Sequence, residues 1–318
     1  MSHNLSRPQL NSEDTQTYVP VLQSRSEFLQ VRGSRHHLRR WGSAKAPLLV
    51  LLHGWMDNSA TWQFMIDQLQ MDWNIVAPDW AGFGLSEKRG HYAFTEYLAD
   101  LEALLDHLSP DEPVRLIAHS MGANISSLYA GVRPERVQSF INLEGVGPFP
   151  NQLETLSARI VNWLDSLAQP GAGRTVLVPD VAHLAAKMLR KNPRIDPAQA
   201  DFLARHFVEP HPDGGLRIAA DVKTFSFIPI FPHAEQVETL LASITARVLF
   251  IRGTESFVTR AFKGHEDVLQ RRFERVAGSQ TLVLDVAGHN LQHDVPQQLA
   301  AVIEDFLAKH SQEEPASA

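Results

Sequence analysis

The chain alternates short, continuous runs of apolar residues with longer segments that carry apolar side chains at helical spacing. Continuous apolar runs of this kind are typical of strands that are buried on both faces of a parallel sheet. They lie at residues 47–53, 73–79, 114–118, 137–143, 247–253 and 280–286. Segments with helical spacing follow most of them, at residues 60–69, 94–108, 121–131, 262–276 and 295–309. This alternation predicts an α/β fold class, with a mostly parallel central sheet and helices on both faces.

Two parts of the chain depart from the alternation. Residues 27–33 and 35–42 form two short strand-like segments around a Gly-Ser turn, which predict a hairpin at the edge of the sheet. Residues 146–245 instead hold helical segments that are separated by joints rich in proline and glycine, at 153–167, 181–191 and 197–206. An insertion of this length is far beyond an ordinary connection, so we expect a helical lid inserted after the sixth strand.

Ser120 lies where a predicted strand meets a predicted helix. A serine on such a sharp turn is held in a strained backbone conformation, which requires small residues two positions before and after it. Ala118 and Gly122 meet this requirement. The turn lifts the hydroxyl clear of the sheet and presents the backbone N–H of Met121 to a developing oxyanion. Ser120 is therefore the candidate nucleophile.

A serine nucleophile needs a base beside it, and the base needs a carboxylate that orients it. In an open parallel sheet such groups lie on loops past the carboxyl ends of the strands. His289 follows the last predicted strand and is preceded by Gly288, so its ring can reach toward the serine. A second oxyanion donor is expected after the strand at 47–53, from the backbone N–H of Trp55 facing that of Met121.

Composition and charge limit the chemistry and the binding partners that the chain can have. The 318 residues include no cysteine, which excludes disulfides, cysteine nucleophiles and thiolate metal sites. The net charge is -7 without a basic stripe, so nucleic acid is not an expected partner. No run approaches membrane-spanning length, and the polar N-terminal residues carry no signal-peptide core. We therefore expect a cytoplasmic protein that acts on a small molecule.

Four motifs in a fixed order give the chain a family resemblance. They are His53-Gly54-Trp55, residues 79–86, residues 118–122 and Gly288-His289. Together they resemble the α/β-hydrolase superfamily, in its lid-bearing, serine esterase-like branch, from about residue 27 to residue 309 apart from the lid. The resemblance implies that Asp79, Gly82 and Gly84 shape the fold and the floor of the pocket rather than act in catalysis.

The domain organisation follows from the insertion and the polar ends. We expect an α/β-hydrolase core formed by residues 21–145 and 246–310, with the helical lid at residues 146–245 between its two parts. Residues 1–20 are expected to form a flexible N-terminal arm and residues 311–318 a flexible tail.

The resemblance leaves the acid of the triad open. In this superfamily the acid usually follows the seventh strand, three residues after a glycine, and Ser256 holds that position here. Glu255 lies one residue early, and Glu144 ends the sixth strand, which is also a carboxyl-end position. An Arg-Gly-x-x-Ser segment resembles a subset of the superfamily in which the acid has moved to the sixth strand. We therefore favour Glu144 and keep Glu255 as the alternative acid.

The type of nucleophile separates relatives with different chemistry. Haloalkane dehalogenases and epoxide hydrolases of this fold attack with aspartate, whereas Ser120 implies an acyl-enzyme. We expect a carboxylesterase-like activity (EC 3.1.1 type) on an ester, thioester or lactone, without a cofactor or a metal. The alternatives are C–C bond hydrolysis or a non-hydrolytic relative, such as a cofactor-independent lyase or dioxygenase or a ligand-binding receptor.

Apolar side chains in the predicted lid indicate the substrate. Phe225, Phe227, Ile230 and Phe231 are the candidate pocket residues, and they favour an apolar acyl or aryl substrate. The same side chains can equally form the core of the lid itself.

Overall fold

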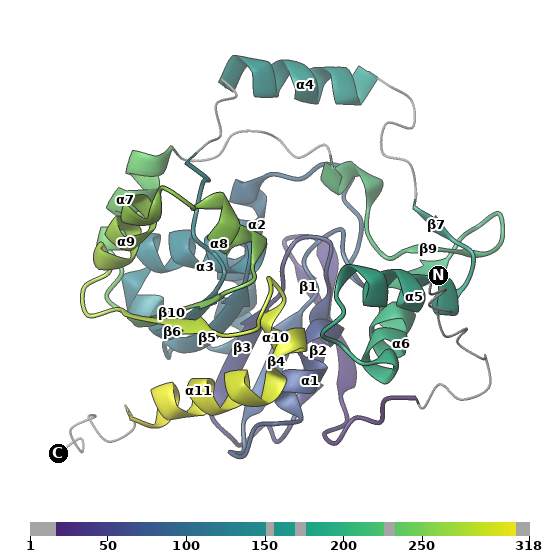
Figure 1. Ribbon diagram of the computed structural model, residues 1–318, viewed down its shortest axis with the longest axis horizontal. Helices are drawn as coiled ribbons and strands as arrows, with labels where there is room; N and C mark the ends of the chain where they lie inside the picture. The colour runs from purple at the N-terminus through teal and green to yellow at the C-terminus, as the bar shows by residue number, and fades with distance from the viewer. Residues whose placement is uncertain (1–16, 151–155, 169–175, 226–232, 310–318) are drawn as a thin grey trace, which may run out of the picture.

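The computed structural model describes residues 17–150, 156–168, 176–225 and 233–309 (Figure 1). Its centre is an eight-stranded sheet with the strand order β1-β2-β4-β3-β5-β6-β10-β11. The strands are β1 (Arg25–Val31), β2 (Ser34–Trp41), β3 (Leu48–Leu52), β4 (Asn74–Pro78), β5 (Val114–His119), β6 (Val137–Leu143), β10 (Arg247–Gly253) and β11 (Gln280–Leu284). β1 and β2 form the predicted antiparallel hairpin at the edge, and β2 pairs antiparallel with β4. All pairs from β4 to β11 are parallel, which confirms the mostly parallel sheet.

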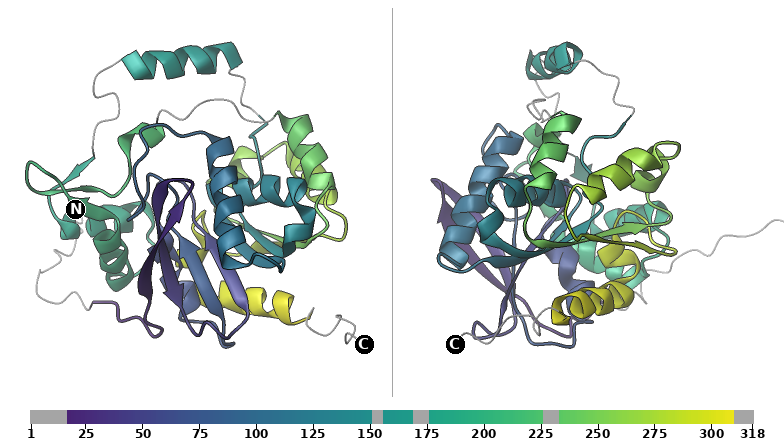
Figure 2. Two further views of the ribbon diagram at one scale, coloured as in Figure 1. Left: turned by 180° about the vertical axis from the view of Figure 1, so that it is seen from behind. Right: turned by 90° about the vertical axis from the view of Figure 1, so that its left-hand side faces the viewer.

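Side chains of the central strands alternate between two helix layers. In β3, Val50 and Leu52 pack into one layer, whereas Leu49 and Leu51 pack into the other. The first layer contains α2 (Phe94–Leu108), α3 (Met121–Val132), α7 (Ala234–Ala242), α8 (Phe257–Ala261) and α9 (Glu266–Glu274). The second contains η1 (Ser59–Trp62), α1 (Gln63–Ile66), α10 (Leu291–Asp294) and α11 (Pro296–Ala308). The side view in Figure 2 shows α11 and the helices of the first layer on opposite sides of the sheet.

The helix predicted over residues 262–276 is shorter in the structure. α9 occupies Glu266–Glu274 within this range, and a separate short helix, α8, ends at Ala261 before the range begins. Gly264 lies between them with a φ of 80°, the left-handed region that glycine adopts without a Cβ penalty. α8 begins directly after Ser256, which caps it by accepting a hydrogen bond from the Val258 N–H at 3.1 Å.

The segment between β6 and α7 holds helices and a small sheet. Its helices are α4 (Leu156–Ala168), α5 (Val181–Lys191), α6 (Pro197–His206) and η3 (Val222–Phe225). The small antiparallel sheet, which the sequence analysis does not predict, has β9 (Leu216–Ile218) between β7 (Leu177–Val178) and β8 (Val208–Pro210). α5 and α6 pack together and against Phe64 of α1, whereas α4 lies apart from them in Figures 1 and 2. Across the described ranges, no helix has both the length and the apolar character needed to span a membrane.

Candidate active site

Ser120 is the single residue between β5 and α3, and its backbone is strained. Its φ is 50° and its ψ is -112°, outside the regions that a serine ordinarily adopts. Its N–H donates to the carbonyl oxygen of Leu143 in the neighbouring β6 at 2.8 Å. A Cβ on Gly122 would come within 2.6 Å of the Leu52 carbonyl oxygen, so a glycine is needed two residues after the serine. The local sequence therefore allows a sharp turn that presents the hydroxyl at the carboxyl edge of the sheet.

The structure brings Ser120 together with His289 and Glu144. The Oγ of Ser120 lies 3.0 Å from Nε2 of His289, and Nδ1 of His289 lies 3.2 Å from an oxygen of Glu144. The three residues follow β5, β11 and β6, which end at the same edge of the sheet. The Glu144 side chain is fully buried, and the His289 side chain is 21% exposed. With the proton on Nδ1, His289 donates to the carboxylate and keeps Nε2 free to accept the serine proton.

Glu144 is held by backbone and side-chain groups of the β10 strand and the turn after it. Its own φ is 64°, and its N–H donates to the Ile251 carbonyl oxygen at 3.0 Å. One carboxylate oxygen accepts the Gly253 N–H at 2.7 Å. The other, which faces His289, accepts a hydrogen bond from the hydroxyl of Ser256. Because each oxygen has a donor, the buried carboxylate is compensated in a place where an unpaired charge would be very costly.

Glu255 occupies a different environment. Its carboxylate forms an ion pair with Arg194, and its side chain is 48% exposed. Its N–H donates to the Ala287 carbonyl oxygen at 2.9 Å, which fixes the backbone beside the His289 loop. Of the two candidate acids, the structure therefore places Glu144 against His289 and directs Glu255 toward Arg194.

The His53-Gly54-Trp55 loop lies directly against the turn that carries Ser120. A Cβ on Gly54 would come within 2.9 Å of His119 Nδ1 and 3.2 Å of the Ser120 Cβ, so a glycine lets the two backbone segments approach closely. Met121 is the first residue of α3, where backbone N–H groups have no partner within the helix and favour negative charge. The Trp55 side chain is 46% exposed. The two predicted oxyanion donors thus belong to two backbone segments that touch beside the nucleophile.

His119 packs against His289 from the buried side. Its Nε2 donates to the His289 carbonyl oxygen at 2.8 Å, and the two ring centroids lie 4.6 Å apart. Burial and the neighbouring His289 imidazole hold the pKa of His119 well below its usual value. A neutral His119 has one ring N–H, and here it donates that N–H to the backbone carbonyl of His289.

The surroundings of Asp79 indicate a structural role, as the resemblance implies. Its buried carboxylate accepts hydrogen bonds from His37 Nδ1 at 2.8 Å, the Ser59 N–H at 2.6 Å and the Leu85 N–H at 2.9 Å. These donors, together with nearby imidazoles, hold the pKa of Asp79 far below its usual value despite its burial. A Cβ on Gly84 would approach the carboxylate to 2.2 Å, so the loop after β4 wraps tightly around this side chain.

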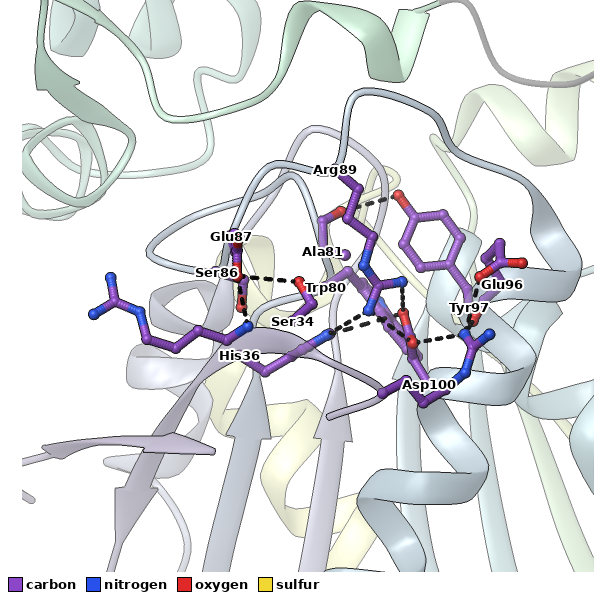
Figure 3. Close-up of polar contacts among 12 residues, drawn as sticks. Ser34, His36, Trp80, Ala81, Ser86, Glu87, Arg89, Glu96, Tyr97 and Asp100 are labelled. Atoms are coloured by element: carbon purple, nitrogen blue, oxygen red, sulfur yellow. Dashed lines mark hydrogen bonds and ion pairs between the residues drawn. The ribbon is translucent and has the colours of Figure 1, made fainter. Parts of the chain in front are cut away.

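A second concentration of charge surrounds Asp100 (Figure 3). The Asp100 side chain is fully buried and accepts hydrogen bonds from Arg89 Nη1 at 2.6 Å and from Arg32 at 3.1 Å. Arg89 also lies 3.1 Å from Nε2 of the buried His36. These contacts join the β1–β2 hairpin and the loop before α2 to α2 itself. The paired charges and the connecting position indicate a structural role for this cluster.

The remaining candidate residues lie beyond what the structure describes. Phe225 ends η3, but its side chain is outside the described residues, as are Phe227, Ile230 and Phe231. Within the described part of the chain, no group of histidine and carboxylate side chains has the arrangement of a metal site.

Comparisons with known proteins agree with this geometry. The alpha/beta hydrolase fold family matches residues 47–296. A serine hydrolase-like protein of Danio rerio is 25% identical over 284 residues, which cover 87% of this chain and 86% of the relative. A serine hydrolase-like protein of Mus musculus is 23% identical over 291 residues, which cover 85% of this chain and 91% of the relative.

Solved structures with the same fold include a biosynthetic enzyme domain. The thioesterase domain from the curacin biosynthetic pathway has a TM-score of 0.77 at 26% identity, over 88% of this chain and 99% of that chain. With a fold, an ordered set of motifs and a family match that covers most of its length, the chain belongs to the alpha/beta hydrolase family.

Proposed function

We propose that this hydrolase cleaves a carboxylic ester, thioester or lactone of an apolar small molecule through an acyl-enzyme on Ser120. The observation that carries the proposal is the continuous hydrogen-bonded chain from the Ser120 hydroxyl through His289 to the buried Glu144. The similarity to serine hydrolase-like proteins and to a thioesterase domain supports acyl transfer to a serine.

In the first half of the reaction, Ser120 Oγ attacks the acyl carbonyl carbon while His289 Nε2 takes the hydroxyl proton. Glu144 stabilises the imidazolium that results and holds its Nδ1–H in place. The carbonyl electron pair moves onto oxygen, where the backbone N–H groups of Trp55 and Met121 donate to it. Loss of one such donor typically costs about 3 kcal/mol of transition-state stabilisation.

In the second half, the carbonyl re-forms and the leaving group departs with the proton that His289 returns. A water molecule then attacks the acyl-enzyme, with His289 again taking a proton as general base. Collapse of this second tetrahedral intermediate releases the carboxylic acid and regenerates the Ser120 hydroxyl. Each proton that His289 accepts is given back, so the cycle needs no cofactor.

In this proposal the segment between β6 and α7 acts as a lid. Residues 219–221 of this segment are anchored to the loop after β4, because the Asp221 N–H donates to the Gly82 carbonyl oxygen at 2.7 Å. The Tyr92 hydroxyl donates to the Asp221 carboxylate at 2.7 Å. The Gly84 N–H donates to the Ala219 carbonyl oxygen at 2.9 Å. These contacts support a lid that is fixed at residues 219–221 to the loop of the 79–86 motif.

Covalent labelling tests the proposal directly. The purified protein is incubated with a fluorophosphonate and digested, and the labelled peptide is identified by mass spectrometry, with Ser120→Ala as the control. We expect one label, on the peptide that contains Ser120, and none on the variant. A folded protein that stays unlabelled, or equal labelling of the variant, would contradict the acyl-enzyme mechanism.

A further inference from the structure

We propose that Phe257 forms a leaving-group subsite that selects esters and thioesters of aryl alcohols or thiols. This inference rests on the proposed function, because it names the substrate class of the same site. Phe257 is not among the pocket residues that the sequence indicates, since those lie in the segment between β6 and α7.

The ring of Phe257 lies on the histidine of the proposed triad. The ring centroids of Phe257 and His289 are 4.5 Å apart, with the planes inclined by 54°. His119, which is buried, packs on His289 with a centroid distance of 4.6 Å. The His289 ring is therefore in contact with a buried imidazole and with a phenyl ring that is still 45% exposed.

An exposed ring at this position has a chemical consequence. His289 must give a proton to the leaving group, so the leaving oxygen or sulfur has to lie within hydrogen-bond reach of Nε2. Nε2 already faces Ser120 Oγ at 3.0 Å, which places the leaving group beside the His289 ring. Phe257, in ring contact with His289, is thus in position to contact the group that departs.

The local fold holds Phe257 in place. It is the first residue of α8, directly after Ser256, whose hydroxyl donates to Glu144. The Phe149 ring continues the aromatic surface, with its centroid 6.1 Å from that of Phe257 and 5.8 Å from that of Phe262. A preformed ring of this kind favours a planar aromatic group, which gains burial and ring contacts on binding. A polyhydroxylated or charged alcohol would lose water against the Phe257 ring without gaining a hydrogen bond from it.

The test compares two esters with the same acyl group in the wild type and in Phe257→Ala. Phenyl acetate carries an aryl leaving group, and trifluoroethyl acetate carries a small, activated alkyl one. Each substrate is compared only with itself, so intrinsic reactivity cancels. We expect kcat/KM for phenyl acetate to fall about tenfold, as for loss of apolar contacts in a pocket, and that for trifluoroethyl acetate to change little. Phe28→Ala, which removes a 46% exposed phenylalanine from β1, is the matched control and should leave both values unchanged.

The rate of deacylation distinguishes two roles of Phe257, which are binding the leaving group and positioning His289. Both esters produce the same acetyl-enzyme, which no longer carries the leaving group. If Phe257 contacts only the leaving group, the acetyl-enzyme should therefore be hydrolysed at the same rate in the wild type and in Phe257→Ala. Equal losses with both esters, accompanied by slower deacylation, would show that Phe257 only positions His289, and would overturn the subsite.

Ligand binding tests the subsite without any turnover. In the Ser120→Ala protein, 2-naphthol binding is followed by its fluorescence, and Phe257→Ala in that background should raise Kd about tenfold. Unchanged binding would overturn the inference even if no ester is cleaved. Failure of the proposed function has a different signature, which is the absence of acylation at Ser120 with every ester.

Discussion

The Ser256 hydroxyl donates a hydrogen bond to the Glu144 carboxylate oxygen that faces His289. In the superfamily that the chain resembles, the position of Ser256 usually holds the acid. Here the serine instead binds a carboxylate that arrives from the end of β6. The turn after β10 therefore takes part in the site as a hydrogen-bond donor, and the negative charge comes from the neighbouring strand.

The first prediction concerns the identity of the acid. Glu144→Gln keeps the shape of the side chain but removes the charge that stabilises the His289 imidazolium. We expect kcat for a short-chain p-nitrophenyl ester to fall by roughly 10⁴, as in other triads. Glu255→Gln, whose carboxylate pairs with Arg194 at the surface, should change kcat by no more than about threefold. A large loss of kcat in Glu255→Gln alone would contradict the assignment of Glu144 as the acid.

The second prediction tests the support that Ser256 gives. Ser256→Ala removes a hydrogen bond to a buried charge, which is worth about 1.5–3 kcal/mol. If that energy serves the transition state, kcat falls about 10- to 100-fold. Circular dichroism and urea unfolding verify that the variant is folded.

Relocation of the acid gives a sharper version of this test. In the Glu144→Gln protein, Ser256→Asp supplies a carboxylate from the turn after β10, beside the position of the Glu144 oxygen. We expect this double variant to recover at least about tenfold in kcat over Glu144→Gln. No recovery in a folded double variant would show that Ser256 does not lie within reach of the His289 ring.

The third prediction is a loss of stability in acid. Burial lowers the pKa of His53 and of His293 to about 4. In His53, Nδ1 donates to the Gly54 carbonyl oxygen at 2.7 Å and Nε2 accepts the Trp80 N–H at 3.0 Å, so protonation of Nε2 breaks a buried contact. The unfolded chain binds protons below about pH 6.5, whereas these folded groups bind them only near pH 4. The free energy of unfolding therefore falls as the pH drops through this window, by up to about 3 kcal/mol per histidine.

Urea unfolding at several pH values measures this effect. His53→Asn cannot titrate, so its stability should depend less steeply on pH than that of the wild type. Asp57, whose pKa burial raises to about 7, contributes with the opposite sign but is common to both proteins. Identical pH dependence in the two proteins would contradict the assignment.

The fourth prediction concerns the charged cluster in Figure 3. Asp100→Asn leaves Arg89 and Arg32 without their buried carboxylate, and breaking such a pair costs about 3–5 kcal/mol in the free energy of unfolding. Asp106→Asn removes a 61% exposed partner of Arg136 and should cost at most about 1 kcal/mol. Urea unfolding of the two variants measures this difference as a difference in their midpoints. Equal midpoints would contradict a structural role for Asp100.

Most of the sheet follows from local patterns in the sequence. Continuous apolar runs predicted the strands because central strands are buried on both faces, and the bounds of β6 and β10 agree with the prediction. The turn at Ser120 was recognisable because its strain demands a glycine at 122, and that demand is visible in the sequence. α8 lies before the helix predicted at residues 262–276, and five residues are too few to show a helical pattern in the sequence.

The arrangement of the site residues depends on the folded backbone as well as on the sequence pattern. Sequence reasoning placed Glu144 and Glu255 at carboxyl ends of strands, but the direction of each side chain depends on backbone angles. Glu144 has a φ of 64°, a conformation that no local pattern indicates for a glutamate. The contacts of Ser256 with Glu144 and of Phe257 with His289 are not visible in the sequence, because they arise only when the turn after β10 meets the end of β6 and the loop after β11.

Direct observation of the acyl-enzyme is the closest test of nucleophilic catalysis by Ser120. The protein is mixed with p-nitrophenyl butyrate, quenched in acid during turnover and digested, and the Ser120 peptide is examined by mass spectrometry. We expect one butyryl group on Ser120, formed together with a burst of p-nitrophenol. Steady turnover without a burst and without acylation of Ser120 would contradict it.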